Sequence, residues 1–193
     1  MAVKQLVVTP ERFRTGLLWP DYVETMKVNK EAHIKNYQEF EVSAEDKAFF
    51  ERAADKAGGL KVVLLTEDWC PDCYRNAPIV AKLADSVEGV EMRVFPRDAN
   101  LDVMDRYLKN GEFRSIPTAV WTDGEMGYLA HWIERSDKAN ADMEIIRERV
   151  AALPEDERRP ANRQMSDELY RTSWRYEVVR ETRARLAKAL DIT

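Results

Sequence analysis

The two cysteines of this chain, Cys70 and Cys73, stand three positions apart, where the sequence predicts that a strand turns directly into a helix. Residues 60–66 form a nearly continuous run of branched apolar side chains, which is typical of a strand buried on both faces of a sheet. Apolar residues then recur from Ile79 to Val87 at helical spacing. The pair is therefore expected at the N-terminal end of a helix in an α/β core.

Both a redox role and a metal site fit two cysteines at this spacing. The start of a helix has unpaired N–H groups and the positive end of the helix dipole, which favour a thiolate at Cys70. A structural zinc site needs four ligands, and the chain has no further cysteine. Its histidines, His33 and His131, are distant in sequence and are expected to be surface or half-buried residues. We therefore expect no metal, with a metal shared between two chains as the minor alternative.

The stretch from Trp69 to Cys73, with Pro78 five residues after the second cysteine, resembles the active site of the thioredoxin superfamily. A second motif, Ile116-Pro117-Thr118, resembles the family's segment in which a cis proline packs over the disulfide. The resemblance covers about residues 43–153 and points to bacterial thioredoxin-like proteins. It implies a thioredoxin fold, an α/β fold with a central mixed β-sheet flanked by helices, here with extra N-terminal and C-terminal helices.

The chain divides into three predicted parts. Residues 1–42 read as a helical N-terminal extension and residues 43–153 as the thioredoxin-fold core. Residues 154–193 read as a charged, proline-bounded linker (154–160) and one long C-terminal helix (166–190) that packs on the core. Glu181 and Arg185 are predicted to form an exposed ion pair on this helix. The first strand of the fold is not obvious, and either residues 6–8 or residues 40–42 could supply it.

The resemblance implies a thiol–disulfide oxidoreductase that reduces disulfides, with Cys70 as the attacking thiolate and Cys73 as the resolving thiol. Cys70 is expected to be exposed, and Cys73 to be more buried. Family positions that contact the substrate correspond to Trp69, Ile116 and Pro117, and the Ile116 backbone is expected to pair with an extended substrate segment. The substrate would be a protein or small-molecule disulfide, and a thioredoxin reductase or a low-molecular-weight thiol would donate electrons. No tightly bound cofactor is expected. The alternative is an interaction module or redox sensor without turnover.

Two departures from the thioredoxins themselves bear on the chemistry. The family's buried aspartate, six residues before the nucleophile, and its lysine partner are replaced here by Leu64 and Val94. Another group must therefore assist Cys73, or the exchange is slower. Asp72 is the nearest candidate, and its charge should raise the pKa of Cys70 and make the couple more reducing. Tyr74 stands where many relatives have a lysine, and the loss of that positive charge acts in the same direction. Because of the Asp72 charge, Asp72→Gly is predicted to lower the pKa of Cys70 and raise the reduction potential.

Composition excludes other function classes. The net charge of -5 and the pI near 5.3 argue against nucleic acid as a partner, because phosphate binding needs a basic face. No apolar run is long enough to span a membrane, and residues 1–10 lack the features of a secretion signal. We therefore expect a cytoplasmic protein. Apolar residues on two faces of the C-terminal helix make a homodimer a further expectation.

Overall fold

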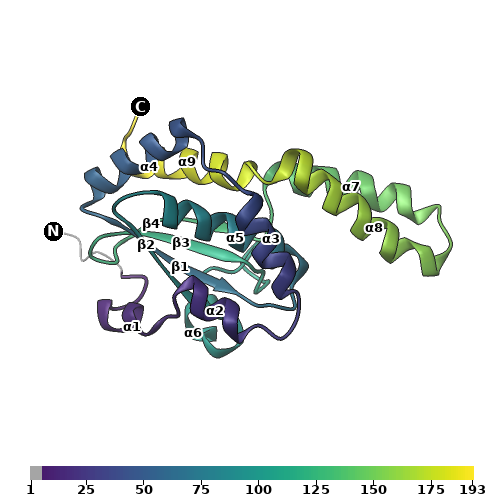
Figure 1. Cartoon of the computed structure of the whole chain (residues 1–193), viewed down its shortest axis with the longest axis horizontal. Helices are drawn as coiled ribbons and strands as arrows, with labels where there is room; N and C mark the ends of the chain where they lie inside the picture. The colour runs from purple at the N-terminus through teal and green to yellow at the C-terminus, as the bar shows by residue number, and fades with distance from the viewer. Residues whose placement is uncertain (1–5) are drawn as a thin grey trace.

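The sheet of the computed structural model, which describes residues 6–193, has four strands in the order β2, β1, β3, β4 (Figure 1). The strands are β1 (Leu60–Thr66), β2 (Val90–Pro96), β3 (Thr118–Asp123) and β4 (Tyr128–Ile133). β1 runs parallel to β2 and antiparallel to β3, and β3 is antiparallel to β4. The predicted α/β fold with a central mixed sheet is confirmed, and β1 is a buried central strand.

Helices cover both faces of this sheet (Figure 1). One face carries α4 (Ala44–Ala57), α5 (Pro71–Ser86) and α9 (Glu177–Leu190) over the larger core, which includes Phe50, Trp121 and Trp132. The other face carries α1 (Pro10–Thr15), the 3-10 turn η1 (Arg97–Ala99) and α6 (Leu101–Met104). The smaller core on that side includes Phe13, Met104 and both cysteines. The cysteine pair thus belongs to the smaller core.

Two more helices lie beside the sheet: α2 (Trp19–Thr25) contacts β2, and α3 (Lys30–Glu39) packs along α5. The helices α1, α2 and α3 all fall in the predicted N-terminal extension, whose residues 1–5 lie outside the described part of the chain. Neither candidate for a first strand forms one. Leu6 makes a single bridge with Gly127, and residues 40–42 connect α3 to α4. At the outer edge of β2, Val94 forms an isolated bridge with Leu17.

The C-terminal part differs from the prediction. The charged segment 154–160 is the first part of a helix, α8 (Glu155–Leu169), and the linker prediction was wrong. Pro160 lies inside α8, fully on the surface, where water can bond the carbonyl that its missing N–H leaves free. α8 pairs with α7 (Asp137–Ala151) in a hairpin that projects from the body of the molecule (Figure 1). A π-helical turn, Tyr170–Trp174, separates α8 from α9, so the predicted single helix is interrupted.

α9 is joined to β4 by a buried carboxylate. Glu181 is only 8% exposed and accepts hydrogen bonds from the Trp132 indole (2.9 Å) and the Asp137 backbone N–H (2.7 Å). Arg185, one turn later, lies 3.4 Å from the same carboxylate. The predicted ion pair is present, but it is not exposed as expected, because Glu181 faces the sheet.

β4 is an edge strand of the sheet. A groove of about 680 Å³ runs beside it, and the lining includes Lys109, Arg135, Arg185 and Lys188. The Arg185 guanidinium donates a hydrogen bond to the His131 backbone carbonyl of this strand (2.8 Å). None of the helices within residues 6–193 has the length and apolar character that crossing a membrane requires.

Candidate functional site

The cysteine pair lies where β1 turns into α5. Cys70 is the residue just before the helix and has an extended backbone, and Pro71 begins the helix, where a missing N–H costs no hydrogen bond. The N–H groups of Cys73 and Tyr74 both reach the Cys70 carbonyl, at 3.1 and 3.2 Å. No side chain caps this helix start, so its backbone donors remain directed at the first cysteine.

The Cys70 thiol is biased toward the thiolate. Hydrogen bonding from the Cys73 thiol lowers the pKa of Cys70, and the backbone N–H groups of Cys73 and Asp72 act in the same direction. Burial and the Asp72 charge oppose this lowering of the pKa without cancelling it. Sequence reasoning expected an exposed thiol, whereas Cys70 is only 8% exposed. Its sulfur lies 3.5 Å from the Ile116 carbonyl oxygen, which covers it.

The Cys73 thiol has the opposite character. It is fully buried, and burial together with the neighbouring Cys70 raises its pKa well above the ordinary value. The Thr66 hydroxyl and the Glu67 backbone N–H oppose that rise. Both thiols are free. The site therefore holds one sulfur that ionises readily and a second that keeps its proton.

The loop before β3 covers the pair from one side. The Ile116–Pro117 peptide bond is cis, and both residues are buried. The Thr118 hydroxyl bonds the Ser115 carbonyl (2.8 Å), and the Glu134 N–H bonds the Pro117 carbonyl (2.7 Å). These bonds fix the loop on the sheet. They hold the Ile116 carbonyl against the Cys70 sulfur, and Pro117 is the next residue of this loop.

Trp69 forms an open border of the site. Its side chain is 49% exposed, which is unusual for a residue of this size. The Arg97 guanidinium lies over the ring, 5.1 Å from its centroid. The ring is thus held by a cation on one face and is open to solvent over about half of its surface.

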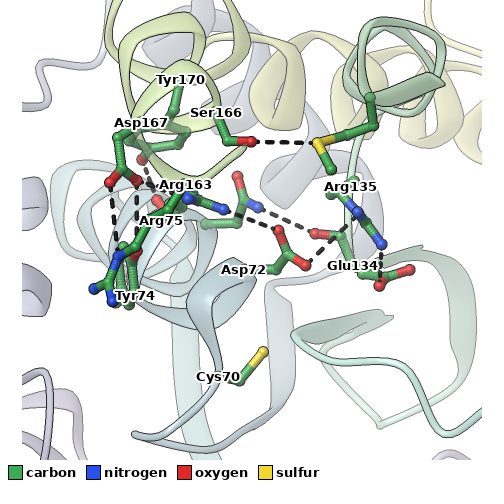
Figure 2. A network of polar contacts seen from close by, with 12 residues as sticks. Cys70, Asp72, Tyr74, Arg75, Glu134, Arg135, Arg163, Ser166, Asp167 and Tyr170 are labelled. Atoms are coloured by element: carbon green, nitrogen blue, oxygen red, sulfur yellow. Dashed lines mark hydrogen bonds and ion pairs between the residues drawn. The ribbon is translucent and has the colours of Figure 1, made fainter. Parts of the chain in front are cut away.

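Asp72, between the two cysteines, is enclosed by two arginines (Figure 2). Its side chain is 17% exposed and lies 3.5 Å from the Arg75 guanidinium and 3.6 Å from that of Arg135. Burial raises the pKa of Asp72, and both arginines act against that rise. Arg135 also pairs with Glu134, which in turn pairs with Lys109. The charge beside Cys70 is thus partly compensated within a network.

Arg75 connects this network to the C-terminal hairpin (Figure 2). Its guanidinium donates two hydrogen bonds to Asp167 of α8, at 2.9 and 2.7 Å. Tyr170, in the π-helical turn, donates from its hydroxyl to the Arg75 backbone carbonyl. The first turns of α5 are therefore held by residues far along the chain.

Pro78 lies inside α5, as predicted, and has a local consequence. A proline has no N–H, so the carbonyl four residues earlier, that of Tyr74, loses its helical partner. The Asn36 side-chain amide of α3 donates to that carbonyl at 2.7 Å. α3 thereby replaces the missing helical bond next to the active-site turn.

Two buried hydroxyl groups lie near Cys73. Tyr22 of α2 and Thr66, the last residue of β1, are 3% and 0% exposed. Within residues 6–193 neither hydroxyl has a hydrogen-bond partner of ordinary geometry. The Thr66 hydroxyl nevertheless lies close enough to influence both Cys73 and Tyr22.

The described residues contain no group of three or more His, Cys, Asp or Glu side chains arranged to hold a metal ion. His33 is fully buried against the Trp19 ring, so the expectation of a surface or half-buried residue was wrong for it. Burial lowers its pKa. His131 is half-buried and bonds the Tyr128 hydroxyl at 2.7 Å.

Several residues of this site were missed by sequence reasoning. Arg75 could have been found, because it follows Asp72 by three positions on a helix. Thr66 gave a weaker signal as the one hydroxyl in an otherwise apolar strand. Arg135, Asp167 and Tyr22 gave none, because only the tertiary fold brings them to the cysteine pair.

Comparison with known proteins agrees with this architecture. The family model described as thioredoxin matches residues 16–151. A crystal structure of a protein of unknown function from Pseudomonas aeruginosa superposes with a TM-score of 0.62 at 15% identity, over 94% of this chain and 99% of that one. A crystal structure of an HIV epitope scaffold gives 0.58 at 15% identity, over the same shares. A search of curated proteins found no match.

Proposed function

The chain belongs to the thioredoxin family, and from this premise we propose that it is a thiol–disulfide oxidoreductase acting as a disulfide reductase. The observation that carries the proposal is the asymmetry of the cysteine pair. The pKa of Cys70 is lowered at the start of α5, while Cys73, fully buried, has a raised pKa. Such a pair can supply one attacking thiolate and one thiol in reserve.

The proposed reaction has two exchange steps. The Cys70 thiolate attacks one sulfur of the substrate disulfide, and the other substrate sulfur leaves as a thiolate that takes a proton from water. Cys73 then loses its proton to solvent and attacks the Cys70 sulfur. The bond between Cys70 and the substrate breaks, and the second substrate thiolate leaves. The substrate gains two electrons, and the protein is left with a Cys70–Cys73 disulfide.

Substrate contact is assigned to Trp69, Ile116 and Pro117. The exposed Trp69 ring offers an apolar surface beside the reactive sulfur, and the Ile116 backbone would pair with an extended substrate segment. We propose a protein or small-molecule disulfide as substrate, and a thioredoxin reductase or a low-molecular-weight thiol as electron donor. The chemistry needs no tightly bound cofactor. A reducing compartment such as the cytoplasm suits a chain whose cysteines are this pair alone.

The test is reduction of insulin and of a small aromatic disulfide by the reduced protein. The wild-type chain should reduce both, and Cys70→Ser should abolish the activity. Cys73→Ser should stop after one exchange and accumulate a mixed disulfide that mass spectrometry detects. Activity that survives Cys70→Ser would contradict the proposal.

The second candidate is an interaction module or redox sensor without turnover. It is favoured by the hairpin of α7 and α8, which projects from the core and is fixed to the active-site helix through Arg75 (Figure 1). This candidate predicts one stoichiometric oxidation of the pair and no repeated reduction of substrate when a donor is supplied in excess. Multiple turnovers would exclude it.

A further inference from the structure

The resolving step leaves a chemical demand on Cys73 that its surroundings must meet. Its sulfur has to carry a negative charge while fully buried, and burial raises its pKa. The positions where the thioredoxins themselves have a buried aspartate and lysine are Leu64 and Val94, and both are fully buried apolar residues. A buried carboxylate at that position therefore does not assist Cys73 in this chain.

The carboxylates nearest to the pair are engaged elsewhere. The Glu67 carboxylate accepts the Asp98 N–H at 2.8 Å, and the Asp68 carboxylate accepts the Lys27 N–H at 2.7 Å. Asp72 pairs with its two arginines. His33 of α3 is held by burial in its neutral form and bonds the Asn29 carbonyl at 3.0 Å. Cys70 and Tyr22 interact with Cys73 directly.

Among residues 6–193, the hydroxyls of Tyr22 and Thr66 are left without a partner, as is the Nε2 of His33. The hydroxyls can donate, whereas a neutral His33 that donates from Nδ1 to the Asn29 carbonyl leaves Nε2 as an acceptor. Buried hydroxyls are nearly always hydrogen-bonded, yet in the described part of the chain these two have no partner of ordinary geometry. Thr66 lies next to Cys73 and also next to Tyr22, whose pKa is raised by burial, so the phenol keeps its proton. Both groups can therefore donate, and Thr66 lies between Tyr22 and Cys73 in this series of contacts.

We propose that Tyr22 and Thr66 form a hydroxyl chain that stabilises the Cys73 thiolate during the resolving step. The Thr66 O–H donates to the Cys73 sulfur, and the Tyr22 O–H donates to the Thr66 oxygen. No proton is taken up by either group: the Cys73 proton passes to solvent water, and the departing substrate sulfur takes a proton from water. This inference rests on the proposed function and deepens it, with Thr66 as a catalytic residue and Tyr22 as a positioning residue that acts through it.

Chained donors strengthen one another in a low-dielectric interior, and a donor to a charged acceptor contributes more than one to a neutral acceptor. In the reduced protein these donors face a neutral thiol, and their contribution grows when Cys73 ionises. This explains why two hydroxyls can stay buried without partners at a site where they would otherwise be unfavourable.

The experiment uses a symmetric aromatic disulfide that releases a coloured thiolate twice. The first release reports attack by Cys70, and the second reports resolution by Cys73. Thr66→Val should slow the second release by about tenfold and Tyr22→Phe by about threefold at neutral pH, with the first release within about twofold of wild type. The pH profile of the second release should move to higher pH in both variants. Thr66→Ser keeps the hydroxyl and should restore the wild-type profile. Tyr176→Phe, at an exposed tyrosine just before α9, is the matched control.

The outcomes separate this inference from the proposed function. If wild type gives no first release, the proposed function fails. If the first release is normal and the second is unchanged in either Thr66→Val or Tyr22→Phe, the hydroxyl chain is overturned. A slower second release accompanied by a lower melting temperature would also overturn it, because that pattern marks a structural role. Retained melting temperatures with a displaced pH profile would support it.

Discussion

The two sulfur atoms differ because the chain places different groups around each of them. Cys70 faces the backbone donors at the start of α5, and Cys73 faces the smaller core. Since a shift of one pKa unit corresponds to about 1.4 kcal/mol between protonation states, even modest differences in surroundings decide which sulfur reacts. Asp72 is the side chain that moderates this difference.

Asp72→Asn is expected to lower the pKa of Cys70 further and to raise the reduction potential. The substitution removes a nearby negative charge, while Arg75 keeps its bonds to Asp167 and Arg135 its pair with Glu134. The local charge becomes more positive, which favours the thiolate. Alkylation of Cys70 in the wild type should persist below the ordinary pH range of a thiol, and in Asp72→Asn to lower pH still. At acidic pH the alkylation rate should rise by about two- to fivefold.

Rapid alkylation followed across pH measures this effect. Glu148→Gln, an exposed acid on α7, is the matched control and should leave the profile unchanged. An unshifted profile in Asp72→Asn, or one shifted to higher pH, would refute the assigned role of Asp72.

At this scale the sequence contained much of the site. Cys70, Cys73, Trp69, Ile116 and Pro117 could be identified because the chemistry requires these residue types in short motifs. The exposure of Cys70 and the partners of Asp72 could not be identified. They depend on the Ile116 carbonyl and on Arg135, which lie far away in sequence and meet the pair only after folding.

Among the elements, α5 depends on α3 at its proline. The Tyr74 carbonyl that Pro78 leaves unpaired accepts from Asn36, which fixes the helix beside the second cysteine. With the Tyr74 carbonyl satisfied, the first turn of α5 keeps its backbone donors directed at Cys70.

Asn36→Ala should lower the free energy of unfolding by about 1 to 2 kcal/mol, because the Tyr74 carbonyl loses its donor. In a Pro78→Ala background the helix can supply its own N–H, so the same substitution should cost clearly less. Urea unfolding of the two single variants and the double variant measures the coupling. Equal costs in both backgrounds would contradict this account of the proline.

The contact between α9 and β4 makes a second prediction at this scale. Glu181→Ala should lower the free energy of unfolding by about 2 to 4 kcal/mol, because the Trp132 and Asp137 N–H groups would be left without acceptors. Lys188→Ala, on the exposed side of the same helix, should change it by less than about 0.5 kcal/mol. Chemical denaturation measures both, and similar small losses would show that Glu181 is not a structural residue.

Element prediction succeeded where the side-chain pattern matched the environment. The apolar run 60–66 predicts a central strand, and these residues form β1, in which nearly all of them are buried. It failed at α8, where a charged, proline-bounded segment has no apolar stripe in its first turns because residues 154–160 are all exposed. The helix can form because acidic residues in its first turn suit the dipole and α7 supports the remainder.

At the scale of the whole molecule, the hairpin of α7 and α8 is the part with least support. It projects from the body (Figure 1), and few of its side chains are buried. Its base is attached to α5 through the bonds that Asp167 and Tyr170 make with Arg75. Segments with few buried contacts open most easily, so this anchoring decides how often the hairpin detaches.

Asp167→Ala should speed cleavage by trypsin after Arg158, at the tip of the hairpin, by about three- to tenfold. The reason is that Arg75 loses its partner and the hairpin opens more often. Glu168→Ala, the exposed acid next to Asp167 on α8, serves as the control. Fragment masses over time locate the first cut, and equal cleavage rates in the two variants would show that Asp167 does not anchor the hairpin.

The edge of β4 has a consequence for how copies of this protein behave in concentrated solution. A bare sheet edge is a template on which another chain can extend the sheet and begin aggregation. Here the Arg185 guanidinium already donates a hydrogen bond to the His131 carbonyl, and Lys109, Arg135 and Lys188 line the same groove. An incoming strand would have to displace one cation and desolvate others, so growth of fibrils or sheet-to-sheet polymers from this edge is suppressed.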